Sequence, residues 1–509
     1  MGKTLVKAAH LATLDDSLGV IPRGAIVVEG GRIAAAGPWE EISRLGPFAE
    51  EAGSLEDDIL MPGLTSAHHH AGRNFRDGIS DQPLECWIQT LYGNAQSAGF
   101  NDEEVYLNTV WSCLELIRGG CTSVVDHHAP SPARERLGVP AAVRAYRDAG
   151  MRVGLCVGVR NQNRFHYEGD EAVFGRLPPE VQEEVGGFLK PLDQGRFFET
   201  WDSYFEDLHE PEGRVRIFLG PSGPQWCSED LLARVKDAAG RRSTGIQIHL
   251  LETVYQRALG PRWKGKSLVR WLDELGFWGE EVSCAHGVWL SREDMDILRD
   301  RGVTLVHNPS SNLRLSSGIA PVRLMREAGM SVAIGADGMG MNDDNDMLTD
   351  LRLGHLLQRL PGVDTPPIAP GEWWKLAVAG GARALLQPGD LGSLAPGKKA
   401  DFILVSAKRL RAPAANPDLD PLELLLQRGV GRDVHAVYVE GRALMREGKI
   451  LSVDEEALAA EIGRIWALRY PRVKALRPLY KKLEEEIRKE FGGWDLRLPH
   501  ANCYRYNAP

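Results

Sequence analysis

Residues 59–70 read ILMPGLTSAHHH, an apolar run that is interrupted by Pro62 and Gly63 and ends in three histidines. A short apolar run beside a turn signal is typical of a buried β-strand. Side chains alternate along a strand, so His68 and His70 point to one face and His69 points to the other. Taken alone, such a pair is also compatible with two partly buried histidines. In a strand that ends in a cavity, it predicts two imidazoles able to share a cation.

Seven further apolar runs follow, and nearly all of them finish in a polar residue. They end at Asp126, Arg160, Pro221, His249, His286, His307 and Asp337. Most gaps between them carry helical patterns that close with glycine, such as DEEVYLNTVWSCLELIRGG at 102–120. Eight strand–helix repeats predict an α/β fold with a (β/α)8 TIM-like barrel. In that fold the carboxyl ends of all the strands meet at one mouth, where the polar residues would converge.

Both ends of the chain have a different, all-β texture. GAIVVEGGRIAAAG at 24–37 places two glycines between β-rich runs, as a hairpin does. DFILVS at 401–406 and VHAVYVEGRALMREGKIL at 434–451 have the same character. We therefore predict a small β-sandwich that is built from residues 1–60 and 389–452, with the barrel, residues 61–388, inserted between its two parts.

Two segments fit neither unit. Residues 161–213 form a long gap rich in Glu, Phe and Tyr, which is either a lid or interface element or a decorative insertion with a minor core. Residues 453–509 are predicted to be a helical extension, because KKLEEEIRKEF at 481–491 is typical of a solvated helix. The aromatic tail LRLPHANCYRYNAP at 496–509 favours docking on the barrel or on a neighbouring subunit.

Composition narrows the class of protein. The chain has 509 residues with 43% hydrophobic and 26% charged residues, which is ordinary globular usage. Lys and Arg number 60 against 70 Asp and Glu, a formal net charge of -10 without any long basic block, so nucleic acid and anionic membranes are poor candidate partners. The seven cysteines are widely spaced and include no Cys-x-x-Cys pair, which favours a reducing compartment. No signal peptide or run of about 20 apolar residues is evident, so we expect a cytoplasmic protein.

Further polar residues at strand ends suggest catalysis. His249 closes the fifth run, and Glu252 follows three residues later in HLLET, where a carboxylate could move protons beside a metal-bound water without binding the metal. His286 and Asp337 end the sixth and eighth runs. Individually, a helix-start glutamate, a core histidine or a helix-capping aspartate would explain each of them. Together with the His pair, they predict a mononuclear metal site with an open water position.

Six motifs carry a resemblance that covers nearly the whole chain apart from 161–213 and the C-terminal extension. They are MPGLTSAHHH (61–70), HLLET (249–253), CAHGVWL (284–290), HNPSSNLRLSSGIAPV (307–322), IGADGMGMNDDNDM (334–347) and GSLAPGKKADFILV (392–405). The set resembles the amidohydrolase superfamily, and within it the branch of guanine and adenosylhomocysteine-type deaminases and triazine hydrolases. The resemblance implies a barrel with a two-ended sandwich. It also implies metal binding by His68, His70, His249 and Asp337, with Glu252 and His286 handling protons.

The number of metal ions follows from a departure in the fourth barrel strand. Two-metal members of this superfamily use a bridging carboxylated lysine, typically on that strand, whereas VRIFLGPSGPQ at 215–225 contains none. We therefore expect one divalent ion. Zinc is the leading candidate, and iron or another divalent ion is the alternative, because imidazole and carboxylate ligands discriminate weakly.

The expected reaction is hydrolytic removal of an amino group from a nitrogen heterocycle such as a purine, pterin, pyrimidine or triazine. Asp337 and His286 would orient the attacking water, and Glu252 would protonate a ring nitrogen before ammonia leaves. The alternative is hydrolysis of another C–N or C–X bond, in a cyclic amide or in an N-alkyl or chloro-triazine. A non-catalytic scaffold is disfavoured, because every expected ligand and Glu252 are present. A homo-oligomer, most simply a dimer, is the expected assembly.

Substrate contacts are expected around the metal. The candidates are residues after the His pair, an aromatic wall for a flat ring, the end of the fourth strand and the turns after the last strands. They are Arg73, Arg76, Trp87, Gln225, Trp226, Asn312 and Met341. For Trp87 structural packing is nearly as good an explanation, and asparagine is favoured in turns for backbone reasons alone.

Overall fold

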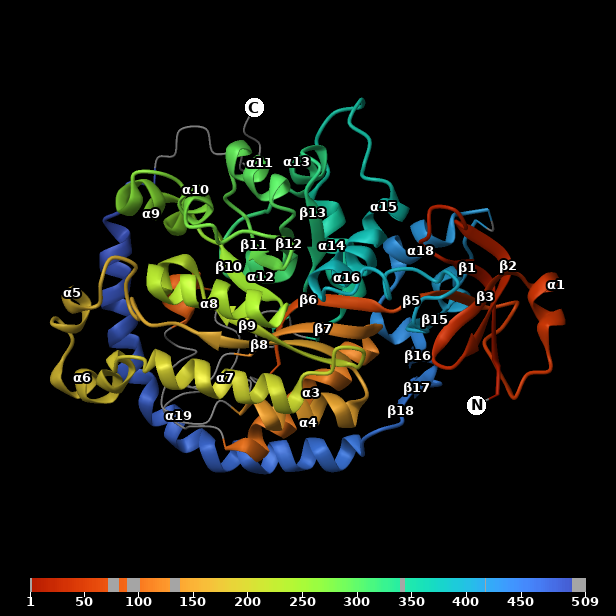
Figure 1. Ribbon diagram of the computed structural model, residues 1–509, viewed down its shortest axis with the longest axis horizontal. Helices are drawn as coiled ribbons and strands as arrows, with labels where there is room; N and C mark the ends of the chain where they lie inside the picture. Colours follow the sequence, from red (N-terminus) through yellow and green to blue (C-terminus); the bar gives the residue numbers. More distant parts are fainter. Residues whose placement is uncertain are drawn as a thin grey trace.

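The computed structural model describes residues 2–71, 82–88, 101–128, 138–338, 344–416 and 418–496. In these residues the strands form two sheets, a parallel one at the centre of the molecule and a mostly antiparallel one at one end (Figure 1). Helices surround the parallel sheet. The predicted α/β class is confirmed.

The parallel sheet is the predicted barrel. Its strands are β6 (Leu64–His70), β7 (Cys121–His128), β8 (Arg152–Val159), β9 (Val215–Pro221), β10 (Ile246–Leu250), β11 (Val282–His286), β12 (Thr304–His307), β13 (Ser331–Ile334) and β14 (Asp337–Gly338). Each strand pairs with the next along the chain from β6 to β13, and β14 pairs with β6. Since β13 and β14 are two halves of the eighth run, this run closes the circle by joining β12 to β6.

Helices follow the strands because capping residues start them and their apolar faces cover the sheet. Asn101 and Ser291, for example, each form a capping box at the start of α3 and α11. The helices of the barrel are α3 (Asp102–Arg118), α4 (Val139–Ala149), α7 (Gln194–Leu208), α8 (Glu229–Arg242), α9 (Val254–Lys264), α10 (Leu268–Glu274), α11 (Arg292–Asp300), α12 (Pro309–Arg314), α13 (Val322–Glu327), α14 (Met347–Leu357), α15 (Pro370–Lys375) and α16 (Gly381–Ala384). Every residue of β7 and β8 is buried, as expected of parallel strands covered on both faces.

The second sheet is assembled from both ends of the chain, as predicted. Its strands are β1 (Thr4–Ala12), β2 (Val20–Glu29), β3 (Arg32–Pro38), β4 (Glu50–Ala52), β5 (Asp58–Pro62), β15 (Phe402–Ser406), β16 (Val434–Val439), β17 (Arg442–Arg446) and β18 (Lys449–Ile450). Antiparallel pairing of β15 with β5 joins the two ends. The Gly30–Gly31 hairpin is also confirmed, with φ of 59° and 78° at the two glycines, a backbone conformation that other residues rarely adopt. The domain boundaries at 60/61, 388/389 and 452/453 stay predictions.

Several short helical elements remain, besides three helices that are described below. They are α1 (Trp39–Ile42), α17 (Ala407–Arg411) and α18 (Pro421–Arg428), the 3₁₀ turns η1 (Ser43–Leu45), η2 (Gly186–Leu189), η3 (Pro224–Trp226) and η5 (Gly431–Asp433), and the π-helical turn η4 (Leu376–Gly380).

A buried ion pair connects the two sheets. Arg152, the first residue of β8, has Nε 3.1 Å from Oδ2 of Asp401, which immediately precedes β15. Its Nη2 also lies 3.0 Å from Oε1 of Glu440. Arg152 and Asp401 are almost fully excluded from solvent, so the barrel and the second sheet share a charged contact.

The long gap at 161–213 has two parts in the structure. Its second half contains α7, which packs on β9 through the indole of Trp201, whose Nε1 donates to the carbonyl of Phe218 at 3.1 Å. This helix therefore takes the place of the barrel helix between β8 and β9. The first half contains α5 (Glu171–Phe174) and α6 (Pro179–Val185) and is additional to the repeat. Whether it acts as a lid stays a prediction.

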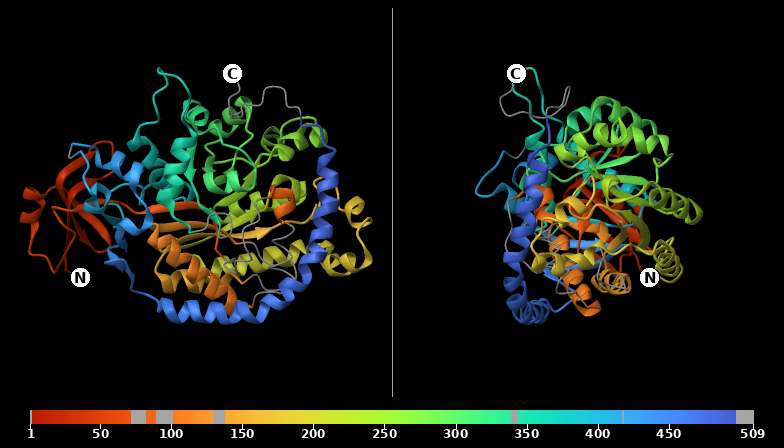
Figure 2. Two further views of the ribbon diagram at one scale, coloured as in Figure 1. Left: turned by 180° about the vertical axis from the view of Figure 1, so that it is seen from behind. Right: turned by 90° about the vertical axis from the view of Figure 1, so that its left-hand side faces the viewer.

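The C-terminal extension is one long, bent helix, α19 (Glu455–Gly492), with Pro471 and Pro478 inside it. It runs along the outside of the barrel and turns up past α5 and α6 (Figure 2). Arg176 of the additional segment has Nε 3.1 Å from Glu486 Oε2 of α19, which ties the two together. Residues 497–509 of the aromatic tail lie outside the described residues. Among the helices that the structure describes, none has the length and apolar character needed to span a membrane.

Candidate metal centre and active site

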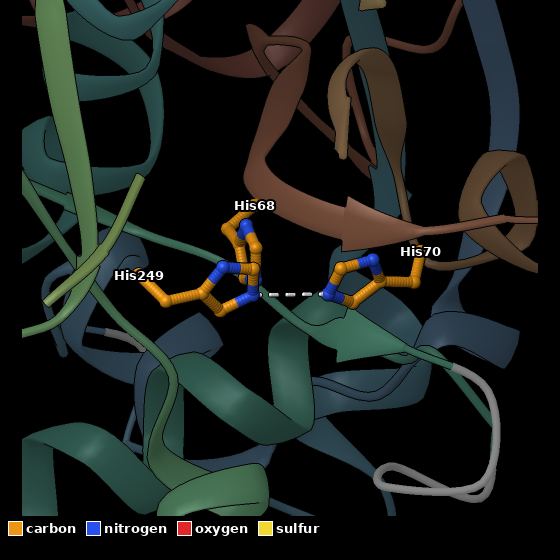
Figure 3. Close-up of side chains that lie close together, drawn as sticks. All are labelled: His68, His70 and His249. Atoms are coloured by element: carbon orange, nitrogen blue, oxygen red, sulfur yellow. Dashed lines mark hydrogen bonds between the residues drawn. The ribbon is translucent and has the colours of Figure 1, made fainter. Parts of the chain in front are cut away.

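Three histidines from opposite sides of the barrel meet at its mouth. His68 and His70 end β6, and His249 comes from β10; Figure 3 shows their imidazoles converging. Nε2 of His70 lies 3.3 Å from Nε2 of His249. One potential ligand atom from each of the three residues lies within 4.8 Å of the others. The structure thus brings together side chains that are 179 positions apart in the sequence.

Asp337 joins this cluster from the closing strand. Its Oδ1 lies 3.4 Å from Nε2 of His68 and 3.6 Å from Nε2 of His70. Its Oδ2 accepts a hydrogen bond from Ser311 Oγ at 2.5 Å. The residue has a φ of 65°, in the left-handed region, a conformation that costs about 1–3 kcal/mol and persists only when surrounding contacts offset that cost. The backbone there is therefore held in a strained conformation that aims the carboxylate at the histidines.

Hydrogen bonds to Nδ1 leave the Nε2 lone pairs of two histidines facing inward. Nδ1 of His68 lies 2.7 Å from Oε1 of Gln247, and Nδ1 of His70 lies 2.7 Å from the carbonyl oxygen of His127. Gln247 donates its Nε2 to the carbonyl of Ala67 at 2.9 Å, which fixes which amide atom faces His68. Since both partners are acceptors, Nδ1 carries the proton and Nε2 can bind a cation.

The donor set fits a divalent metal ion. Nε2 of His68 and Oδ1 of Asp337 are buried and have no hydrogen-bond partner among the residues that the structure describes. Buried polar atoms left without a partner are unfavourable, and coordination of a cation would satisfy both. Three imidazoles and one carboxylate are common ligands of zinc and related ions. The chain therefore carries a buried His/Asp metal-binding site.

Burial and mutual proximity set the protonation that such a site needs. Burial, with the neighbouring histidines adding to it, holds the pKa of His249 well below its usual value. For Asp337 burial alone would raise the pKa, but His68, His286 and His70 outweigh it and hold the pKa well below the ordinary range. Neutral imidazoles and an ionised carboxylate are the forms that bind metal.

Glu252 and His286 lie beside this cluster. Oε2 of Glu252 is 3.6 Å from Nε2 of His286, and that nitrogen is 4.0 Å from Oδ2 of Asp337. Burial, and then Asp337 and Glu85, raise the pKa of Glu252 well above its usual value, so its carboxyl can hold a proton at higher pH than an exposed glutamate. Burial lowers the pKa of His286 to about 4, which keeps its imidazole neutral near pH 7. An acid and a neutral imidazole thus flank the metal-binding cluster.

Comparison with known proteins agrees with this geometry. The model of the amidohydrolase family matches residues 59–444, which include all of these side chains. The chain belongs to the amidohydrolase family. The predicted superfamily and the predicted class of enzyme are confirmed.

This amidohydrolase has relatives that are similar along almost their whole length. It is 31% identical over 462 residues to a 5'-deoxyadenosine deaminase from Methanosarcina mazei, covering 91% of this chain and 97% of the relative. It is also 31% identical over 467 residues to a 5-methylthioadenosine/S-adenosylhomocysteine deaminase from Pelotomaculum thermopropionicum, covering 91% and 97%.

Solved structures show the same fold. A zinc-bound adenosine deaminase from Xanthomonas campestris superposes with a TM-score of 0.80 at 23% identity, covering 93% of this amidohydrolase and 98% of that chain. A triazine hydrolase from Arthrobacter aurescens gives a TM-score of 0.81 at 24% identity, covering 92% and 100%. The predicted barrel with an appended sandwich is therefore confirmed.

The structure describes four of the seven residues that were predicted to contact the substrate. Gln225 and Trp226 lie in η3 at the end of β9 and are buried, and both amide atoms of Gln225 lack a hydrogen-bond partner among the described residues. Asn312 contacts His286, with Oδ1 2.9 Å from Nδ1. Trp87 lies in a short helical segment, residues 84–88, and packs partly buried against the core. Arg73, Arg76 and Met341 lie outside the described residues.

The structure adds residues that the sequence did not single out. Gln247 precedes His249 by two residues on the same face of β10, a spacing that could have suggested it. Ser311 lies in the stretch HNPSSN at 307–312. Nothing nearby in the sequence indicates that its hydroxyl donates a hydrogen bond to Asp337. Glu85, in PLECWI beside Trp87, is buried near Glu252 and raises the pKa of its carboxyl. His127 supplies the carbonyl that orients His70.

Proposed function

We propose that this amidohydrolase binds one zinc ion through His68, His70, His249 and Asp337 and hydrolytically removes an amino group from a nitrogen heterocycle. The observation that carries the proposal is the buried Glu252, 3.6 Å from His286 and beside a cluster of metal-binding side chains. A proton-bearing carboxyl next to a water-activating centre is what deamination of a ring requires. The names of the two relatives described above, both deaminases of adenine-containing compounds, support the same reaction.

A bound divalent cation would lower the pKa of water from 15.7 towards roughly 7 and so supply a nucleophile at neutral pH. Asp337 holds its ionised carboxylate where it can accept the proton that this water loses, and Ser311 fixes the orientation of that carboxylate. His286, neutral and held by Asn312, presents Nε2 towards the same position and can orient the water.

Glu252 would act on the substrate itself. With its raised pKa it can donate a proton to the ring nitrogen next to the carbon under attack, so negative charge does not accumulate on the ring. The Glu252 carboxylate that remains can then take the proton of the hydroxyl group added to the ring, and the proton that Asp337 took from water can pass to the departing amine, which leaves as ammonia. Glu252 is then protonated again and Asp337 ionised again, as both were at the start.

We propose a purine-type ring as the first substrate class, because the curated relatives act on 5'-deoxyadenosine, 5-methylthioadenosine and S-adenosylhomocysteine by name. The buried amide of Gln225 offers an N–H donor group at Nε2 and an acceptor at Oε1, which suits the edge of a heterocycle. Trp87 and Trp226 are proposed to stack on its faces. Asn312, Arg73, Arg76 and Met341 remain candidates for contacts to substituents.

The assembly and compartment are part of the proposal. The six cysteines that the structure describes are free and buried, which suits a cytoplasmic enzyme. A homodimer is proposed on general grounds, and light scattering of the purified protein measures it directly.

The test combines metal analysis with a screen for ammonia. Protein loaded with zinc is incubated with adenosine-type nucleosides, guanine, pterins, aminopyrimidines and aminotriazines, and ammonia is measured. We expect release from the adenosine-type group, and release that is about 10²–10⁴-fold slower from a Glu252→Gln variant. Release of an alkylamine or chloride from substituted triazines, or opening of a cyclic amide, without ammonia from any amino heterocycle would replace deamination by the alternative hydrolysis.

A further inference from the structure

Four hydrogen-bonded side chains lie next to Glu252 and outside the metal-binding cluster. Oε1 of Glu85 accepts hydrogen bonds from Thr253 Oγ1 at 2.5 Å and from Tyr167 Oη at 2.9 Å. Gln256 closes the circle, because its backbone N–H donates to Thr253 Oγ1 at 3.4 Å and its Nε2 donates to Tyr167 Oη at 3.5 Å. All four side chains are buried. We call these four residues the Glu85 network.

The Glu85 network holds the backbone that carries Glu252. The N–H of Glu252 donates to Oε1 of Gln256 at 2.8 Å. The next residue, Thr253, belongs to the network and caps α9. Leu251, on the other side, has a φ of 44°, so the chain turns sharply just before the catalytic candidate. Any shift of Gln256 or Thr253 therefore moves the Glu252 carboxyl relative to His286.

Tyr167 brings two segments outside the barrel repeat into this network. It lies in the additional part of 161–213, and its ring centroid is 5.0 Å from that of Phe491 in α19. Trp494, just beyond α19, is 6.4 Å from Tyr167 and stacks under the guanidinium of Arg262. Since the family match ends at residue 444, α19 lies beyond it. A peripheral helix therefore packs directly on a residue that is one hydrogen bond away from Gln256.

We propose that Tyr167, held in place by Phe491 of α19, is a positioning residue for Glu252. The inference rests on the proposed proton-transfer role of Glu252. Through the Glu85 network, the additional segment and the C-terminal helix set where the catalytic carboxyl lies, although neither of them supplies a metal-binding side chain. The Tyr167 hydroxyl is the group that transmits this effect, because it contacts both Glu85 and Gln256.

Removal of this hydroxyl is expected to slow the chemical step. Tyr167→Phe keeps the aromatic ring against Phe491 but removes one of the two side-chain hydrogen bonds that hold the Gln256 amide, which loosens it. A small misplacement of a catalytic group can cost up to about 10²-fold, so we expect kcat to fall roughly tenfold while KM and zinc content change little. Tyr106→Phe is the matched control, because the Tyr106 hydroxyl also donates to a carboxylate, Asp148 Oδ2 at 2.9 Å, but at the surface between α3 and α4.

The first experiment is a double-mutant cycle. Tyr167→Phe and Tyr106→Phe are each measured in wild-type protein and in a Glu252→Gln background. If Tyr167 acts through Glu252, its loss lowers kcat roughly tenfold in the first background and less than about twofold in the second. An equal loss in both backgrounds, a change confined to KM, or loss of zinc would overturn the inference. Failure of wild-type protein to release ammonia would instead count against the proposed function.

The second experiment does not depend on activity. Hydrogen exchange is followed in the peptide that covers residues 250–256, which contains the Glu252 amide bonded to Gln256. Tyr167→Phe and Phe491→Ala are expected to speed exchange in this peptide at least severalfold, whereas Tyr106→Phe leaves it unchanged. Unchanged exchange in the Tyr167→Phe protein would overturn the inference, whatever reaction the enzyme catalyses.

Discussion

Nδ1 of His68 lies 2.7 Å from Oε1 of Gln247, two residues ahead of His249 on the same face of β10. One strand therefore supplies both a candidate metal-binding side chain, His249, and the hydrogen-bond partner that orients another candidate, His68, on the opposite strand. Gln247 is itself held by the carbonyl of Ala67 and by Ser283 Oγ at 3.1 Å, so its orientation is fixed from two sides.

Replacement of Gln247 by leucine is expected to weaken zinc binding by about 10–100-fold, because His68 would lose the acceptor that fixes its tautomer. His68→Ala removes a ligand outright and is expected to be worse. Zinc retained against a series of chelators measures both. Wild-type affinity in the Gln247→Leu protein would mean that the contact does not orient a metal ligand.

Conversion of Glu252 to glutamine is expected to reduce turnover by about 10²–10⁴-fold, since an amide of the same shape cannot transfer a proton. Zinc content should stay stoichiometric, because Glu252 belongs to neither group of described side chains that could hold a metal ion. Steady-state kinetics and metal analysis of the same preparation check both statements. Loss of zinc together with activity would reassign Glu252 as a ligand.

The ion pair between Arg152 and Asp401 predicts a large stability effect at the junction of the two sheets. Arg152→Met leaves the buried Asp401 carboxylate without its charged partner and is expected to lower the free energy of unfolding by about 3–5 kcal/mol. Arg241→Met provides the comparison, because Arg241 is exposed in its pair with Asp237 and should change stability by about 0–1 kcal/mol. Urea unfolding measures the two differences, and equal effects would contradict the structural role of Arg152.

Burial of His307 is expected to account for part of the stability that the zinc-free protein loses at acid pH. Burial, aided by His286, lowers its pKa to about 3, whereas an unfolded chain would titrate at its ordinary value of 6.5. Between these values the unfolded state binds one more proton, so this contribution to stability is complete above pH 6.5 and is lost as the pH falls towards 3.

In the His307→Gln variant the unfolded state no longer binds this extra proton. The dependence of the unfolding free energy on pH should become shallower by about 1.4 kcal/mol per unit in the middle of this interval. Denaturant unfolding at a series of pH values gives both slopes. Identical slopes would show that His307 ionises alike in the folded and unfolded protein.

Local chemistry was enough to predict the barrel and its mouth. Eight apolar runs of strand length, most of them followed by a glycine-closed helical pattern, leave few arrangements other than a closed parallel sheet. Alternation along β6 also predicted that His68 and His70 share a face. These features depend on neighbours within a few positions, which is the range over which side-chain periodicity and turn preferences act.

Other features depend on contacts between distant segments and left no local signal. The residues near Glu85 in the sequence do not mark it as a functional candidate, because its hydrogen-bond partners Tyr167 and Thr253 are 82 and 168 positions away. The division of 161–213 into a barrel helix and an additional segment likewise depends on where Trp201 packs. Nothing in the charged sequence of α19 indicates that Phe491 contacts Tyr167.

The sequence by itself determined the type of fold, the family and the set of side chains able to bind a metal, because these follow from residue types and their spacing. Only the tertiary structure decided which groups orient and tune them: Gln247 behind His68, Ser311 beside Asp337, and Glu85 with Tyr167 beside Glu252. Hydrogen-bond geometry and burial act over a few ångströms of space, and closure of the barrel is what turns separations of 179 positions into such distances.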